Sequence, residues 1–194
     1  MKKSASREPV VSLPPLDVDR ARLEFVFDGV FAIAMTLLVL ELKVPELADT
    51  RSVRELISEL GHHGAAFFSY GLSFAMLGIL WYNHQRQYRF IRRVTLGIFI
   101  ANLILMATAA AFPFCAALFG RYPLNGFSVV LYLACLFVHM AASCAQWRLA
   151  ERAGALSLDL EPARAAKFRR GSLAGSLVLG SLALTYLVLA LTRL

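Results

Sequence analysis

The chain has 194 residues and a mass of 21.4 kDa, a length that suits one domain or at most two. Hydrophobic residues make up 58% of it, charged residues only 17%, and the mean hydropathy is +0.61. This leaves too little polar material to cover the surface of a soluble domain. The composition therefore argues against a disordered chain, a secreted disulfide scaffold and an ordinary cytosolic enzyme, and it favours a polytopic membrane protein.

Five stretches with few or no charges predict an all-α bundle of membrane helices. They cover residues 25–40, 60–85, 94–120, 122–147 and 171–192. About 20 apolar residues are needed to cross a hydrocarbon core ~30 Å thick, and four of the stretches meet that length. The first stretch is short and contains Asp28, so hydropathy alone leaves open that it is an interfacial segment.

The segments outside these stretches have distinct expected roles. Residues 1–20 contain three prolines and no apolar core, so we expect a disordered cytoplasmic tail before a membrane domain over residues 21–194. Residues 121–126, with the sequence RYPLNG, predict a tight turn that makes the third and fourth stretches an antiparallel hairpin. Residues 148–170 are expected to form a polar connector with room for a short helix.

The distribution of basic residues predicts the orientation in the membrane. A cytoplasmic N-terminus places fifteen of the 20 Lys and Arg residues on the cytoplasmic side and five on the other, as the positive-inside rule requires. We therefore expect a multi-pass protein of the cell membrane. The same distribution explains the net charge of +7 without a nucleic-acid partner. The acidic loop after the first stretch falls outside, either as a solvated loop or as a region that concentrates cations.

The first stretch carries the most specific pattern. On a helix at 100° per residue, four apolar residues fall within roughly 40° of one another. They are Val26, Ile33, Leu37 and Leu40, flanked by Gly29 and Thr36. Such stripes most often serve ordinary helix packing.

Asp28 is the only acidic residue expected at membrane depth. A carboxylate there is costly, so it should face protein or water and find a partner, which we expect on another helix. A short span with a buried acid fits a central helix of a bundle or an oligomer. The simpler interpretation is that Asp28 pins one helix to its neighbour.

The same region resembles a known family. The strings RLE at 22–24, DGVFAIA at 28–34, TLLVLELKVP at 36–45 and WYNH at 81–84 closely resemble the first two spans of the prokaryotic transmembrane protein 175 potassium-channel family. The resemblance covers about residues 20–150. It implies a homotetrameric cation channel in the lipid bilayer, with a pore lined by the first helix of each subunit and with potassium as the permeant ion. It implies neither a bound cofactor nor a metal site.

The resemblance also assigns roles to individual residues. It places Ile33 at the tightest constriction, Leu37 and Leu40 in further apolar rings, and Thr36 in a layer linked to potassium preference. The motif Arg-x-x-x-Phe-Ser-Asp of the family corresponds to Arg22, Val26, Phe27 and Asp28 here, so Val26 and Phe27 replace its Phe and Ser.

The remaining implications concern the anchoring of the first helix. Arg22 and Asp28 are expected to tie its cytoplasmic end to neighbours, with Asn83 and His84 as candidate partners. The family has six spans, whereas this sequence shows five.

Other features leave alternative interpretations open. The three cysteines, Cys115, Cys135 and Cys144, lie in apolar stretches without a CxxC pair and are expected to be inert hydrophobic side chains. His139 is expected to hydrogen-bond across helices, and the small residues of the last stretch to favour close packing. Since no catalytic motif is present in the sequence, we expect no enzyme. A small secondary transporter, or a multi-pass protein without pore activity, stays an alternative to the channel.

Overall fold

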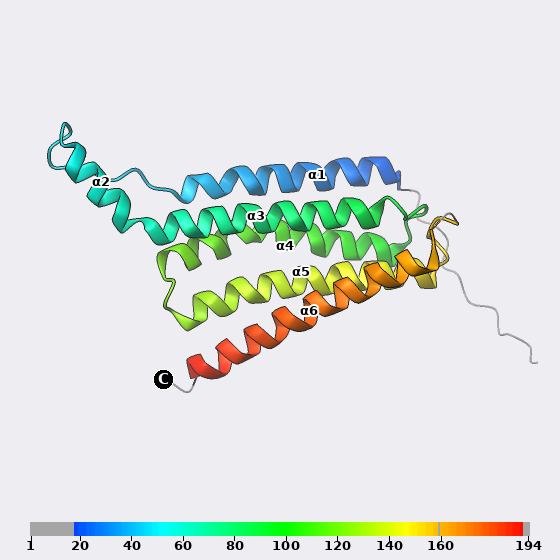
Figure 1. Cartoon of the computed structure of the whole chain (residues 1–194). Helices are drawn as coiled ribbons and strands as arrows, with labels where there is room; N and C mark the ends of the chain where they lie inside the picture. Colours follow the sequence, from blue (N-terminus) through cyan, green and yellow to red (C-terminus); the bar gives the residue numbers. More distant parts are fainter. Residues whose placement is uncertain (1–17, 159, 192–194) are drawn as a thin grey trace, which may run out of the picture.

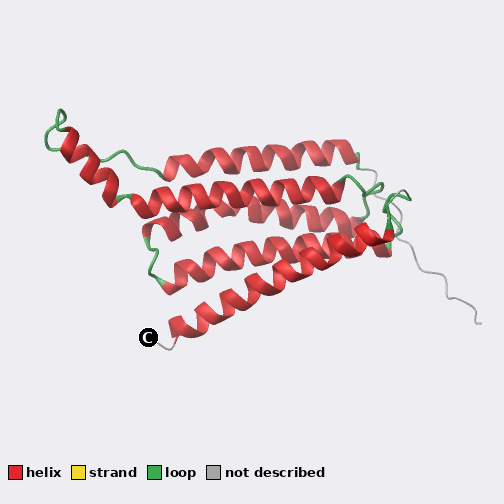
Figure 2. Cartoon of the chain, in the orientation of Figure 1, coloured by secondary structure: helices red, strands yellow, loops and turns green. Residues whose placement is uncertain are grey.

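The computed structural model describes residues 18–158 and 160–191, which form one bundle of long helices (Figure 1). The elements are α1 (Arg20–Leu37), the 3-10 helix η1 (Leu38–Glu41), α2 (Val53–His62), α3 (Gly64–Tyr88), α4 (Leu96–Arg121), α5 (Gly126–Arg152) and α6 (Pro162–Leu191). Figure 2 shows helices joined by loops throughout the described part. The prediction of an all-α membrane bundle is confirmed.

Five of these helices are long and apolar enough to cross a membrane: α1 with η1, α3, α4, α5 and α6. The sequence pattern suggested that the first of them is short. It has 22 residues instead, because α1 begins at Arg20 and η1 extends the helix to Glu41. Asp19 caps its start by accepting a hydrogen bond from the Ala21 N–H at 2.9 Å, as short acidic side chains do at helix N-termini. The predicted tail over residues 1–20 lies largely outside the described residues.

The helices run alternately up and down, and the two ends of the bundle differ (Figure 1). One end holds the start of α1 and the loops between α3 and α4 and between α5 and α6. The other end holds α2, the α4–α5 turn and the end of α6. The predicted hairpin is confirmed, since α4 ends at Arg121 and α5 begins at Gly126. In that turn Asn125 caps α5 by accepting from the Phe127 N–H at 2.9 Å.

The predicted polar connector over residues 148–170 is largely helical instead. The final turn of α5 continues to Arg152 and α6 begins at Pro162, so the loop between them is short. This loop pairs with the α3–α4 loop through a bridge between Ile91 and Leu156. Charged residues near helix ends do not stop a helix, because their side chains reach the membrane surface while the backbone bonds continue.

The segment after η1 also contains an element that the sequence analysis missed. Ser52 accepts a hydrogen bond from the Glu55 N–H at 3.2 Å and begins α2. This helix projects from the end of the bundle that also holds the α4–α5 turn, and none of its residues is buried. Its exposed apolar side chains, at positions that recur every three or four residues, form one face. They are Val53, Leu56, Ile57 and Leu60.

Small residues on α6 allow it to lie close to α5. A Cβ atom at Gly175 would come within 2.6 Å of the Met140 side chain, and one at Gly180 within 2.9 Å of the Phe137 ring. Membrane helices commonly approach one another over such residues, because no hydrophobic effect drives them together within lipid. The expected packing role of this face is confirmed.

We predict opposite effects for two matched glycine substitutions on α6. Gly171→Ala meets no atom within 4 Å and should stabilise the helix by about 0.5–1 kcal/mol. Gly180→Ala must displace the Phe137 ring and should lose that gain or destabilise by about 1–3 kcal/mol. Thermal unfolding of both variants in the same detergent measures the difference. Equal melting temperatures would contradict the close approach of α5 and α6.

Candidate functional site: the first helix and its partners

Helix α1 has one face buried in its own subunit. Leu23, Phe27, Phe31, Ala34 and Leu38 are each at most 6% exposed. The rings of Phe27 and Phe31 stack with centroids 4.8 Å apart, and both belong to a core that includes residues of α3, α4 and α5. Spacings of three and four residues place these side chains on one side of the helix. Their burial fixes the rotation of α1 in the bundle.

The stripe expected from the sequence lies on the exposed side of α1, about a third of a turn around the helix from the buried face. Within one subunit Ile33 is 61% exposed, Leu37 41% and Leu40 71%. Val26 is also exposed and continues the stripe toward the start of the helix. The structure therefore brings these residues together on one apolar surface that the subunit itself does not cover.

Thr36 lies beside this stripe and is exposed. Its Oγ1 donates a hydrogen bond to the carbonyl oxygen of Ile33 at 2.8 Å. A hydroxyl has one donor and two acceptor lone pairs. With the proton used by the backbone, the oxygen presents lone pairs outward, which suits contact with a cation.

Asp28 has its partners on another helix, as expected, but they are not the residues that the sequence suggested. Its Oδ1 accepts hydrogen bonds from Trp81 Nε1 at 2.8 Å and from Gln85 Nε2 at 2.5 Å. Both donors are on α3, one turn apart. The spacing of four residues between Trp81 and Gln85 is visible in the sequence and places both side chains on one face of α3.

The other residues of the expected anchoring network lie elsewhere. His84 is buried and stacks on the Phe27 ring with centroids 3.4 Å apart, while its Nε2 donates to Asn102 Oδ1 at 3.0 Å. It thus supports α1 through Phe27, the residue that replaces the serine of the family motif. Asn83 is half-buried on α3, and Arg22 is exposed on α1.

At the start of α1, Arg20 makes an ion pair and a contact with α3. It forms an ion pair with Glu24 at 3.7 Å, and its guanidinium lies 5.5 Å from the centroid of the Tyr88 ring. Arg20 therefore connects the start of α1 to the end of α3 within one subunit. Arg22 points away from these contacts, on the outward side that also carries Val26.

His139 makes the cross-helix hydrogen bond that we expected. Its Nδ1 lies 2.8 Å from Oγ1 of Thr108 on α4, and its ring meets Phe31 edge-on at 5.8 Å. His84 and His139 thus contact successive aromatic residues on the buried face of α1. Each histidine is in turn held by a polar side chain of α4.

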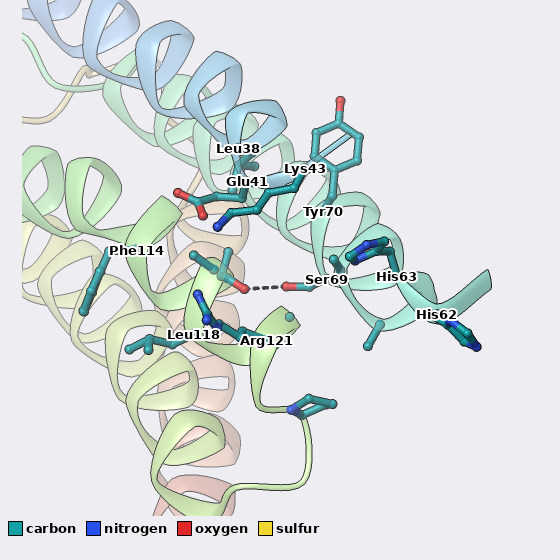
Figure 3. Close-up of a pocket in the computed structure, with 16 residues that line it drawn as sticks. Leu38, Glu41, Lys43, His62, His63, Ser69, Tyr70, Phe114, Leu118 and Arg121 are labelled. Carbon is teal, nitrogen blue, oxygen red and sulfur yellow. Dashed lines mark hydrogen bonds between the residues drawn. The ribbon is translucent and has the colours of Figure 1, made fainter. Parts of the chain in front are cut away.

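A pocket opens beside the end of η1, at the end of the bundle that holds α2 and the α4–α5 turn (Figure 3). It has a volume of about 750 Å³ and includes Leu38 and Glu41 of η1 in its lining. Lys43 and Arg121 point toward the same space as Glu41 in Figure 3, whereas His62 points away. Within residues 18–158 and 160–191, no group of three His, Cys, Asp or Glu side chains is placed to hold a metal ion.

Comparison with known proteins places this arrangement among channels. A family model described as the endosomal/lysosomal potassium channel TMEM175 matches residues 22–113. A potassium channel of Streptomyces collinus is 31% identical over 171 residues, which cover 84% of this chain and 82% of the relative. The endosomal/lysosomal proton channel TMEM175 of Mus musculus is 30% identical over 129 residues, 59% of this chain but only 26% of that protein.

A solved structure has the same fold. The crystal structure of a lysosomal potassium-selective channel TMEM175 homolog from Chamaesiphon minutus matches with a TM-score of 0.66 and 25% sequence identity. The match covers 88% of this chain and 97% of that chain. The relatives are named as channels, and the prediction that this chain is not an enzyme is confirmed.

We predict that Trp81→Phe weakens the link between α1 and α3. The variant keeps an aromatic ring but loses the N–H that donates to Asp28. Since Trp81 is 39% exposed, we expect the free energy of unfolding to fall by about 1 kcal/mol rather than more. Tyr82→Phe, which alters an exposed neighbour on the same helix, serves as the control. Equal thermal stability of both variants in detergent would argue against this hydrogen bond.

Proposed function

Because the chain belongs to the TMEM175 family of potassium channels, we propose that four copies form a potassium-permeable pore lined by α1. The observation that carries this proposal is the outward apolar stripe of Ile33, Leu37 and Leu40, which the buried Phe27–Phe31 face leaves exposed. One such helix encloses no path for an ion. Several copies around a shared axis enclose one, with the stripe facing inward.

The geometry of α1 supports a central place for it. The exposed side extends from Val26 to Leu40 along nearly the whole helix, while the rest of the subunit covers the other side. A homotetramer gives each stripe two adjacent copies and one opposite copy around the axis, and most homo-oligomers have closed symmetry of this kind. The flanks of α1 then contact neighbouring subunits, and the exposed faces of α4 and α6 contact lipid.

The pore closes and selects through side chains alone. Rings of isoleucine and leucine close a narrow path sterically and by dewetting, and they admit an ion only when they widen. Potassium gives up its hydration water more readily than sodium does, so an apolar constriction at Ile33 favours potassium. The outward lone pairs of Thr36, next to this constriction, add a site for partial coordination.

The orientation follows from the charges at the two ends. The end of the bundle with the start of α1 also carries the arginine-rich segments that follow α3 and α5. Such segments stay on the cytoplasmic side of a membrane. We therefore place the N-terminus in the cytoplasm and the outer pocket of Figure 3 on the opposite side of the cell membrane.

We predict that Ile33→Ala changes potassium flux several-fold, because it widens the constriction. Ile100→Ala on α4 is the matched control, since Ile100 is 47% exposed and lies on a helix that we assign to the lipid side. Purified protein in liposomes, with a potassium gradient and a potassium-sensitive dye, measures the flux. Two outcomes would contradict a place for Ile33 in the pore. One is wild-type potassium flux in Ile33→Ala, and the other is an equally large change of flux in Ile100→Ala.

The same liposomes test which ion passes. Replacing internal potassium by sodium should lower the flux, and a pH-sensitive dye without added protonophore measures any proton flux. The measurement of proton flux is included because vertebrate relatives are named as proton channels. A flux that requires a second, coupled ion would favour the transporter alternative.

The oligomeric state is a separate test. We expect the mass of the protein in lipid nanodiscs to correspond to four subunits. We also expect Ile33→Cys, but not Ile100→Cys, to form disulfide-linked subunits on mild oxidation. A single subunit by mass, or cross-linking at Ile100 alone, would contradict a pore formed by α1.

A further inference from the structure

A cluster of buried polar side chains lies behind α1, between α3, α4 and α5, in the half of the bundle that contains the start of α1. His84 contacts both Tyr88 and Asn102, and Gln146 lies on α5 three residues after Ser143. The side chains of His84, Tyr88, Asn102 and Gln146 are each at most 3% exposed. None carries a formal charge. The nearby pair of Gln87 and Ser143 links α3 to α5 at 3.2 Å at the same level.

Several polar atoms of this cluster have no hydrogen-bond partner within the described residues. They are Nδ1 of His84, the hydroxyl of Tyr88, Nδ2 of Asn102, and both Nε2 and Oε1 of Gln146. A membrane interior offers no bulk solvent to such atoms, and nearly all buried polar groups in proteins are satisfied. So many unsatisfied atoms at one level of a bundle point to a ligand.

The chemistry of these atoms identifies the ligand class. Since His84 Nε2 donates to the Asn102 oxygen, its Nδ1 is left as an acceptor, whereas Nδ2 of Asn102 is a donor. Gln146 presents one donor and one acceptor, and the Tyr88 hydroxyl can be either. A cation would face unfavourable donors and an anion unfavourable acceptors. Water, which donates and accepts, matches the whole set.

The local packing is consistent with this ligand. The Asn102 side chain lies close enough to Tyr88 to interact with it, yet the Tyr88 hydroxyl has no partner with hydrogen-bond geometry.

One further unsatisfied atom lies beside the cluster, toward the end of the bundle that holds the start of α1. The guanidinium of Arg20 lies over the Tyr88 ring at 5.5 Å, and its Nε is itself buried without a partner within the described residues. The Arg20 side chain is 35% exposed, so it lies between the Tyr88 side of the cluster and the aqueous end of the bundle.

We infer that each subunit binds ordered water at the His84–Tyr88–Asn102–Gln146 cluster, behind α1 and separate from the outward stripe. These waters complete the hydrogen bonds of His84, whose ring supports Phe27 at 3.4 Å. The inference concerns the interior of one subunit and does not depend on what the outward stripe conducts.

Gln146→Met tests the inference, because the two alternatives predict shifts of opposite sign. Methionine has nearly the same shape but no amide. If water satisfies Gln146, the variant loses those bonds and the melting temperature of the full-length protein falls by about 2–4 °C. If the amide is dry and unsatisfied, its removal relieves that penalty and the melting temperature rises. Leu136→Met, on the same helix at a buried apolar position, is the control and should change little.

A second measurement keeps the test independent of how well the variant folds. A high-resolution structure of the wild-type protein in nanodiscs should show density within hydrogen-bond distance of Gln146 and Asn102. Density there supports the inference. Its absence, in a map that shows ordered water elsewhere at the same depth, would overturn it, as would a higher melting temperature for Gln146→Met.

Discussion

The burial of Phe27 and Phe31 determines what the rest of α1 is free to do. Both rings pack into the core that α3, α4 and α5 share, and two histidines from α3 and α5 contact them. A helix with one face fixed in this way has no freedom to rotate, so Ile33 and Leu40 must point out of the subunit. The outward stripe is thus a consequence of the inward contacts, and the residues of both faces belong to the same short stretch of sequence.

Polar contacts give the bundle its specificity. Inside a bilayer, apolar side chains gain little by leaving lipid for protein, so hydrogen bonds and close approach of small residues decide which helices meet. Several pairs of neighbouring helices have such a bond, whereas α5 and α6 approach each other over small residues. Examples are Asp28 with Trp81, His84 with Asn102, Ser73 with Tyr132 and Thr108 with His139. On α5 the polar residues recur every three or four positions and face the interior.

Much of the fold was predictable from the sequence, because membrane spans and helix faces depend on local patterns. The five spans, the hairpin at residues 121–126 and the common side of Ile33, Leu37 and Leu40 needed only composition and a period of 3.6. The partners of Asp28 were not predictable in the same way. Whether Asn83 or its neighbours Trp81 and Gln85 meet the carboxylate depends on the rotation of α3 against α1, which is set by packing across the whole bundle.

The change from α1 to η1 has a geometric consequence for the outer end of the stripe. In a 3-10 helix residues three apart eclipse one another, and the rise per residue is greater than in an α-helix. Leu40 lies in η1, three residues after Leu37, so its side chain is turned toward the line of Leu37 instead of being offset from it. In the proposed tetramer, the two leucines of each copy would form a longer, straighter apolar sleeve, and an ion would cross it without water over a greater length than a single ring would impose.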